Sequence, residues 1–148
     1  MSCIHLACTV SLTTFPCARR NLGFLLSDGP HDQAAAWAAL DPDTRRSLKD
    51  AYSRAGIAVV VSAFGETDSP AGSGVDPAAL AQAMANWVIA YGMDGIDVDW
   101  EETALARARA GVGEQWLVTF TQVLRTRDRK STRLNSSHSG ESRMPSSA

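Results

Sequence analysis

Two helix-start signals set the order of elements in this chain. An Asp-Pro pair occurs at residues 41–42 and again at 76–77. Asp caps the first turn of a helix well, and Pro suits the first helical position because its missing N–H has no partner there. Gly56 and Gly92 follow at the distances where the two helices should end. The sequence therefore predicts two helices, each running from its Pro to the vicinity of its Gly.

Short apolar runs flank these helices. They are NLGFLLS at 21–27, which ends in the turn signal DGP, IAVVVSAF at 57–64, and GIDVDW at 95–100. Nearly continuous β-branched runs are typical of strands covered on both faces, as in parallel sheets. A last helix is predicted over about 114–127. Strand and helix alternate three times, which predicts an α/β fold with parallel strands. Periodicity alone does not separate an open doubly wound sheet from a barrel.

The run DGIDVDWEE at 94–102 places acidic residues inside a strand that is predicted to be interior. Side chains alternate faces along a strand, so Asp97, Asp99 and Glu101 should share one face, with successive carboxylates about 7 Å apart. The apolar residues between them should face the helices. Like charges and burial are expected to raise some of these pKa values and to couple the titration of the group.

This acidic row has three interpretations. A solvated acidic face fits poorly with an interior strand. A metal site is favoured by clustered oxygen ligands, but the calcium loop with alternating acids also needs polar neighbours and a Gly, whereas Val98 and Trp100 stand here. General acid chemistry fits best, because carboxylates at the carboxyl end of a parallel strand lie where α/β barrels build active sites. Glu101, the outermost acid, can then hold a proton for a leaving oxygen.

The run DGIDVDWE, Asp94 to Glu101, resembles the strand-four motif of glycoside hydrolase family 18, the chitinase family, at eight consecutive positions. VVVSAFG resembles the third strand of that family and NLGFLLSDGP the second. The similarity covers roughly residues 21–127 and is closest to fungal members. The chain departs from the family at Phe64, which stands where the third strand often has the first Gly of Ser-x-Gly-Gly. The resemblance implies a (β/α)8 TIM barrel, of which this chain would hold about three βα units.

The resemblance also implies a mechanism and a set of residues. Glu101 matches the acid that protonates the glycosidic oxygen, and Asp99 matches the carboxylate that orients the N-acetyl group of the substrate. Asp97 matches the partner that shares a proton with Asp99, while Asp94 and Ser62 match supporting positions. The attacking group would be the carbonyl oxygen of the substrate itself, which makes this family an exception to the two-carboxylate scheme. Neither a metal nor an organic cofactor is implied.

The implied substrate is chitin or its N-acetylglucosamine oligosaccharides. Two other functions use the same fold. A non-catalytic carbohydrate-binding barrel protein typically lacks the acid that Glu101 provides here, which favours an enzyme. An endo-β-N-acetylglucosaminidase that acts on glycoprotein glycans uses the same acids, so the motif does not separate it from a chitinase.

The two ends of the chain differ from its middle. Residues 128–148 hold seven Ser and no apolar periodicity, which predicts a disordered tail. DNA that encodes DRKSTRLNSSH resembles a widely used short-read sequencing adapter, so this segment is set aside as non-native. Residues 1–20 hold all three Cys but no convincing signal peptide, and the spacing of Cys3, His5, Cys8 and Cys17 matches no usual zinc pattern. The 148-residue chain is therefore expected to be a partial, inactive catalytic domain over 21–127.

Composition excludes several other classes of protein. The formal net charge is −2, with no basic stretch that would follow a phosphate backbone, so a nucleic-acid partner is not expected. No apolar run reaches the roughly 18 residues that span a bilayer. Gly72-Ser73-Gly74 precedes a helix but lacks the pattern of a phosphate-binding loop, and a linker is the better interpretation.

Overall fold

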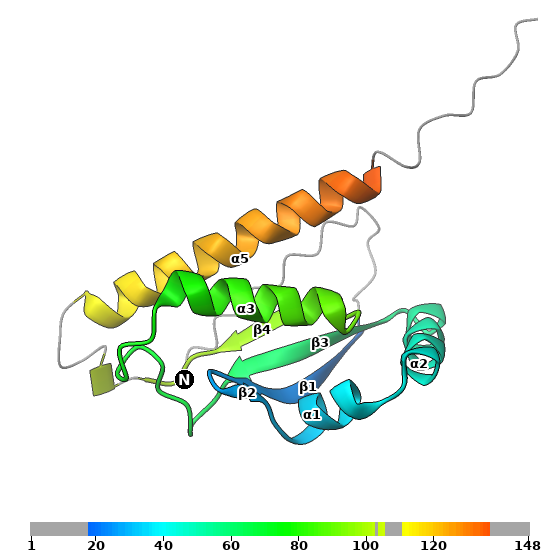
Figure 1. Ribbon diagram of the computed structural model, residues 1–148, viewed down its shortest axis with the longest axis horizontal. Helices are drawn as coiled ribbons and strands as arrows, with labels where there is room; N and C mark the ends of the chain where they lie inside the picture. The colour runs from blue at the N-terminus through cyan, green and yellow to red at the C-terminus, as the bar shows by residue number, and fades with distance from the viewer. Residues whose placement is uncertain (1–17, 103, 106–110, 137–148) are drawn as a thin grey trace, which may run out of the picture.

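The computed structural model describes residues 18–102, 104–105 and 111–136 of the chain (Figure 1). Within this part, a sheet of four strands is combined with helices. The elements are β1 Ala18–Leu26, β2 Gly29–Pro30, α1 Asp32–Ala39, α2 Pro42–Arg54, β3 Ile57–Phe64, α3 Pro77–Ala90, β4 Gly95–Asp99 and α5 Val112–Ser136.

The predicted parallel sheet is confirmed. The strand order is β2-β1-β3-β4, and β3 pairs in parallel with both β1 and β4. The three parallel strands therefore lie side by side in the order of the sequence, and their carboxyl ends meet at one edge of the sheet. The short strand β2 is the exception, because it folds back antiparallel onto the end of β1.

Both helix-start predictions are confirmed. α2 begins at Pro42, and the Asp41 carboxylate accepts hydrogen bonds from the backbone N–H groups of Asp43 (3.1 Å) and Thr44 (2.9 Å). Hydrogen bonds from Thr44 hold the pKa of Asp41 below its usual value. α3 begins at Pro77 with an Asp cap of the same kind. These caps satisfy N–H groups that have no partner inside the helix.

Two elements were not predicted. The DGP segment was interpreted as a turn only, but Gly29 and Pro30 pair with the end of β1, and α1 follows directly. The Ala-rich composition of α1 is the signal that could have revealed it, because Ala has the highest helix propensity. Trp37 of α1 is buried in the core.

Two elements extend beyond the segments in which the sequence placed them. β1 begins at Ala18, so the boundary expected after residue 20 falls inside this strand. α5 runs to Ser136, so the backbone of residues 128–136 is helical where disorder was expected. Extending an existing helix needs no new nucleus, and Arg, Lys and Leu in this stretch favour propagation. Their helical backbone does not test whether these residues are native. The rest of the predicted tail, like residues 1–17, lies outside the described residues.

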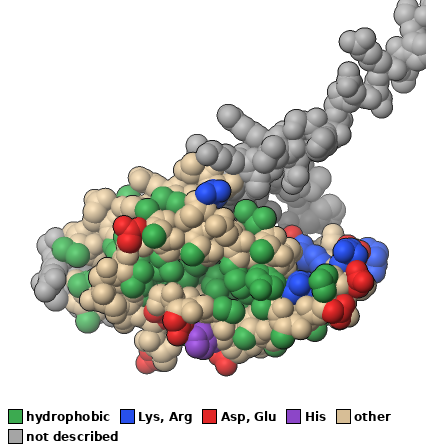
Figure 2. Space-filling view, viewed as in Figure 1, with side chains coloured by type: hydrophobic (Ala, Val, Ile, Leu, Met, Phe, Trp, Pro, Cys, Tyr) green, Lys and Arg blue, Asp and Glu red, His purple; other side chains and the backbone are tan. Residues whose placement is uncertain are grey.

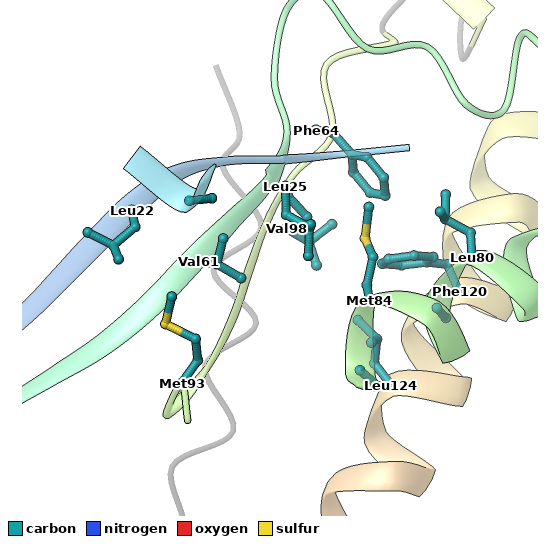
Figure 3. Close-up of a cluster of buried hydrophobic side chains, with 14 of the residues drawn as sticks. Leu22, Leu25, Val61, Phe64, Leu80, Met84, Met93, Val98, Phe120 and Leu124 are labelled. Atoms are coloured by element: carbon teal, nitrogen blue, oxygen red, sulfur yellow. The ribbon is translucent and has the colours of Figure 1, made fainter. Parts of the chain in front are cut away.

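The hydrophobic core fills the space between the sheet and the pair α3 and α5 (Figure 3). Val61 and Val98 project from the sheet towards Met84 of α3 and Phe120 of α5. α3 and α5 lie side by side over this face of the sheet (Figure 1). α3 and α5 thus cover one face of the parallel strands. The candidate site residues of the strands lie on the opposite face.

α2 contributes little to this core, because none of its residues is buried. In the view of Figure 2, hydrophobic side chains gather over the middle of the molecule, whereas charged side chains of both signs gather at the end where α2 lies. Tyr52 of α2 packs against the edge of the core, and Lys49 of α2 pairs with Asp94.

Candidate active site

The predicted alternation along β4 is confirmed for its two central acids. Val98 is 5% exposed and belongs to the core, while Asp97 and Asp99 take the alternate positions and are partly exposed. Ile96 and Trp100 pack against the core as expected. Because neighbouring residues of a strand point to opposite faces, the two carboxylates lie on the face away from α3 and α5.

Asn21 of β1 reaches across the sheet to this carboxylate face. Its side-chain amide donates a 3.1 Å hydrogen bond to Oδ2 of Asp97, although 76 positions separate the two residues in sequence. Ser62 of β3 lies between β1 and β4, paired in register with Asp97 and 7% exposed. Sequence reasoning did not identify Asn21, because an Asn within an apolar run carries no signal of a partner so distant in sequence.

Glu101 is placed differently from the strand-based expectation. β4 ends at Asp99, so the strand alternation that relates Asp97 to Asp99 stops before Glu101. The Glu101 side chain is exposed, and within the described residues no hydrogen bond or ion pair to it is found. The structure therefore places Glu101 just beyond the carboxyl end of β4, with its side chain exposed.

Asp94 lies at the opposite end of the same strand. Its carboxylate accepts a 2.7 Å hydrogen bond from the backbone N–H of Val59 and pairs with Lys49 of α2. Its own N–H donates to the carbonyl oxygen of Val59 at 2.8 Å. Asp94 therefore fastens α2 and the start of β4 to β3, and it supports the sheet from the amino end of β4.

The departure at Phe64 has a clear structural consequence. Strand alternation would place Phe64 on the carboxylate face with Ser62, but its φ of 74° turns the backbone at this point. The ring is 1% exposed and packs against Trp116 (5.8 Å between centroids) and Phe120 (5.1 Å). The floor of the carboxylate face is therefore not blocked by this ring.

Two buried carboxylates near the carboxyl ends of the strands were missed by sequence reasoning. Asp68 (9% exposed) accepts hydrogen bonds from the backbone N–H and the hydroxyl of Ser27, at 2.6 and 2.7 Å. Glu102 (8% exposed) accepts three hydrogen bonds, described below. Asp68 lies in a polar loop, where an acidic residue gives no sign of being buried. Glu102 directly follows the motif that ends at Glu101 and is not part of it.

In the parts of the chain that the structure describes, no three His, Cys, Asp or Glu side chains come together in a way that would hold a metal ion. The Cys and His residues weighed as a zinc site lie outside those parts. None of the described helices has the length and apolar character needed to cross a membrane.

The fold and the site define an α/β protein with a row of carboxylates on β4, a parallel strand that lies at the edge of the sheet within the described residues. Among solved structures, the chain is similar to a GH18 chitinase from Pseudoalteromonas aurantia, with a TM-score of 0.58 and 27% sequence identity. The match covers 74% of this chain and 42% of that one, so the chain spans less than half of its neighbour. No family model matches the chain, and no curated protein shows significant similarity to it. The structural likeness agrees with the family resemblance and supports a glycoside hydrolase, while the fungal origin stays a prediction.

Proposed function

We propose that this chain is part of a glycoside hydrolase that cleaves β-1,4-linked N-acetylglucosamine polymers such as chitin. The observation that carries this proposal is the pair of carboxylates, Asp97 and Asp99, on the face of β4 away from α3 and α5, with the exposed Glu101 two residues after Asp99. Active sites of barrel enzymes lie at the carboxyl ends of their strands, where these three residues are found. The likeness to a GH18 chitinase supports the same class of reaction.

In the proposed reaction Glu101 donates a proton to the glycosidic oxygen. The carbonyl oxygen of the substrate's own 2-acetamido group attacks the anomeric carbon, and water later opens the resulting ring. Asp99 orients that acetamido group and shares a proton with Asp97, which the amide of Asn21 holds from the other side at 3.1 Å. Two displacements at one carbon give retention of configuration, and the scheme requires no metal or organic cofactor.

A partial barrel accounts for the arrangement of the strands. The parallel strands β1, β3 and β4 follow one another in sequence order without reversal, and the core lies on one face of the sheet. A doubly wound sheet would reverse its strand order and cover both faces. We therefore propose that residues 21–127 are about three βα units of a (β/α)8 barrel.

The direct test is hydrolysis by the complete protein. We expect it to cleave N-acetylglucosamine oligosaccharides and to release products that keep the β configuration, as proton NMR of the first-formed anomer would show. Inverted products would contradict the mechanism. Binding without cleavage would favour the carbohydrate-binding alternative, and cleavage restricted to glycoprotein glycans would favour an endo-β-N-acetylglucosaminidase.

The 148-residue chain by itself should hydrolyse no chitin oligosaccharide. Within the described residues β4 pairs with β3 alone, which leaves its other edge open beside the carboxylates. An unpaired edge of this kind promotes association between chains, and the carboxylates remain in water. Size-exclusion chromatography should show association, and an assay should show no activity. A monomeric, cooperatively melting and active preparation of residues 1–148 would contradict this prediction.

A further inference from the structure

Glu102 is a buried acid without a described cation beside it. Its Oε1 accepts hydrogen bonds from the backbone N–H of Ala71 (2.8 Å) and from the indole N–H of Trp100 (3.0 Å), and its Oε2 accepts from the N–H of Gly72 (2.6 Å). None of the ion pairs found in the described part of the chain includes it. Burying a carboxylate is unfavourable unless hydrogen bonds replace its water, and here three N–H donors do so.

The close approach between Glu102 and the loop depends on Gly72. A Cβ atom at this position would lie 2.9 Å from Oε2 of Glu102, a distance that real Cβ contacts do not reach. Its φ lies outside the left-handed range, so an added Cβ would force the Glu102 carboxylate to move without straining the backbone. The Glu102 carboxylate therefore occupies space that is open only because residue 72 is a glycine.

The loop at residues 65–75, between β3 and α3, is held at a second point by Asp68. The two hydrogen bonds from Ser27 fasten this loop to the segment that follows β1. At its far end, Val75 accepts a 2.7 Å hydrogen bond from the indole N–H of Trp116 on α5. One loop thus links the carboxyl ends of β1, β3 and β4, the edge of the sheet where the site lies.

Glu101 is bracketed by two attachments to this same loop. On its amino side, the carbonyl oxygen of Asp99 accepts a 2.9 Å hydrogen bond from the N–H of Gly65. On its carboxyl side, Glu102 holds Ala71 and Gly72. The backbone of Glu101 therefore lies between two residues that are both hydrogen-bonded to the 65–75 loop.

We propose that Glu102 is the positioning residue for Glu101, and that it acts through the 65–75 loop. The catalytic consequence of this inference rests on the proposed function. The brace itself, meaning the hydrogen bonds from Ala71 and Gly72 to Glu102, is independent of that function. A proton donor must stand within hydrogen-bonding reach of the glycosidic oxygen, and a displacement of about 1 Å is enough to lower a rate by roughly 100-fold.

The test uses Glu102→Gln in the complete protein. The amide keeps the shape of the side chain but replaces one accepting oxygen with a donor, so at least one of the three hydrogen bonds is lost. We expect kcat to fall roughly 10- to 100-fold with KM little changed. Glu66→Gln, at an exposed glutamate of the same loop, is the matched control and should leave kcat unchanged. Wild-type kcat in Glu102→Gln would overturn the proposal.

A double-mutant cycle separates positioning from a general structural role. In a Glu101→Gln background, Glu102→Gln should lower the residual rate no further, because the donor that it positions is already absent. A further loss of the same size in that background would show that Glu102 acts on the fold as a whole and would overturn the proposal.

Two further measurements remain informative without activity or if Glu102→Gln folds poorly. Amide hydrogen exchange at Ala71 and Gly72 should be faster in Glu102→Gln than in the wild type. Unchanged exchange would contradict the role of Glu102 in holding the loop. This readout does not depend on whether the protein cleaves chitin. Gly72→Ala disturbs the same contact from the other side with no change of charge, so it should lower kcat, whereas Ser73→Ala in the same turn should not. Equal kcat for Gly72→Ala and wild type would contradict the proposal.

Discussion

Replacing Glu101 with Gln in the complete protein should lower kcat for chitin oligosaccharides by about 10²–10⁴-fold, the usual contribution of a general acid. The Gln amide has nearly the same size, but its N–H protons are not acidic enough to be transferred to the leaving oxygen. Substrate affinity should change little, because the side chain is exposed and makes no hydrogen bond within the described residues. Steady-state kinetics gives the first quantity, and calorimetric titration of an oligosaccharide gives the second.

The Glu66→Gln control used above removes the same charge from an exposed site on the neighbouring loop. It should keep the wild-type rate, which excludes a general effect of net charge on activity. Near wild-type turnover in Glu101→Gln would remove Glu101 from the mechanism and would leave the carbohydrate-binding alternative to be tested next.

A substrate analogue that lacks the 2-acetamido carbonyl oxygen should not be cleaved at all by the complete protein. In the proposed mechanism that oxygen is the nucleophile, so its removal leaves nothing to displace the leaving group. An oligosaccharide with 2-hydroxyl groups in place of 2-acetamido groups is the analogue, and reducing-end release is the measurement. Cleavage of this analogue would point instead to a protein carboxylate, with Asp99 as the first candidate.

Chelation provides the matching test of the metal interpretation of the acidic row. Treatment with EDTA should leave the rate on the normal substrate unchanged, because protonation by Glu101 and attack by the acetamido group need no metal. Loss of activity on chelation that a divalent cation restores would favour the metal interpretation and would count against the acid roles proposed for Asp97 and Asp99.

Local features of the chain could be predicted from its sequence. The caps at Asp41 and Asp76, the helices that follow them and the strand at 57–64 depend on interactions within a few residues, and the structure confirms them. Alternation along a strand is equally local, so the separation of Val98 from the acids beside it was also predictable. The short motif from Asp94 to Glu101 narrowed the expected fold only through its resemblance to a known family, and the structure places β4 at the edge of the described sheet.

Contacts between distant segments were decided by the tertiary structure alone. Asn21 meets Asp97, Ser27 meets Asp68, and Glu102 meets Gly72 only because three parallel strands bring their carboxyl ends to one edge of the sheet. A single polar residue carries no local sign of a partner 30 to 76 positions away. The sequence by itself determined which residues are available for chemistry at this site. The packing of the sheet decided which of them are held, because hydrogen bonds act over about 3 Å in space whatever the separation along the chain.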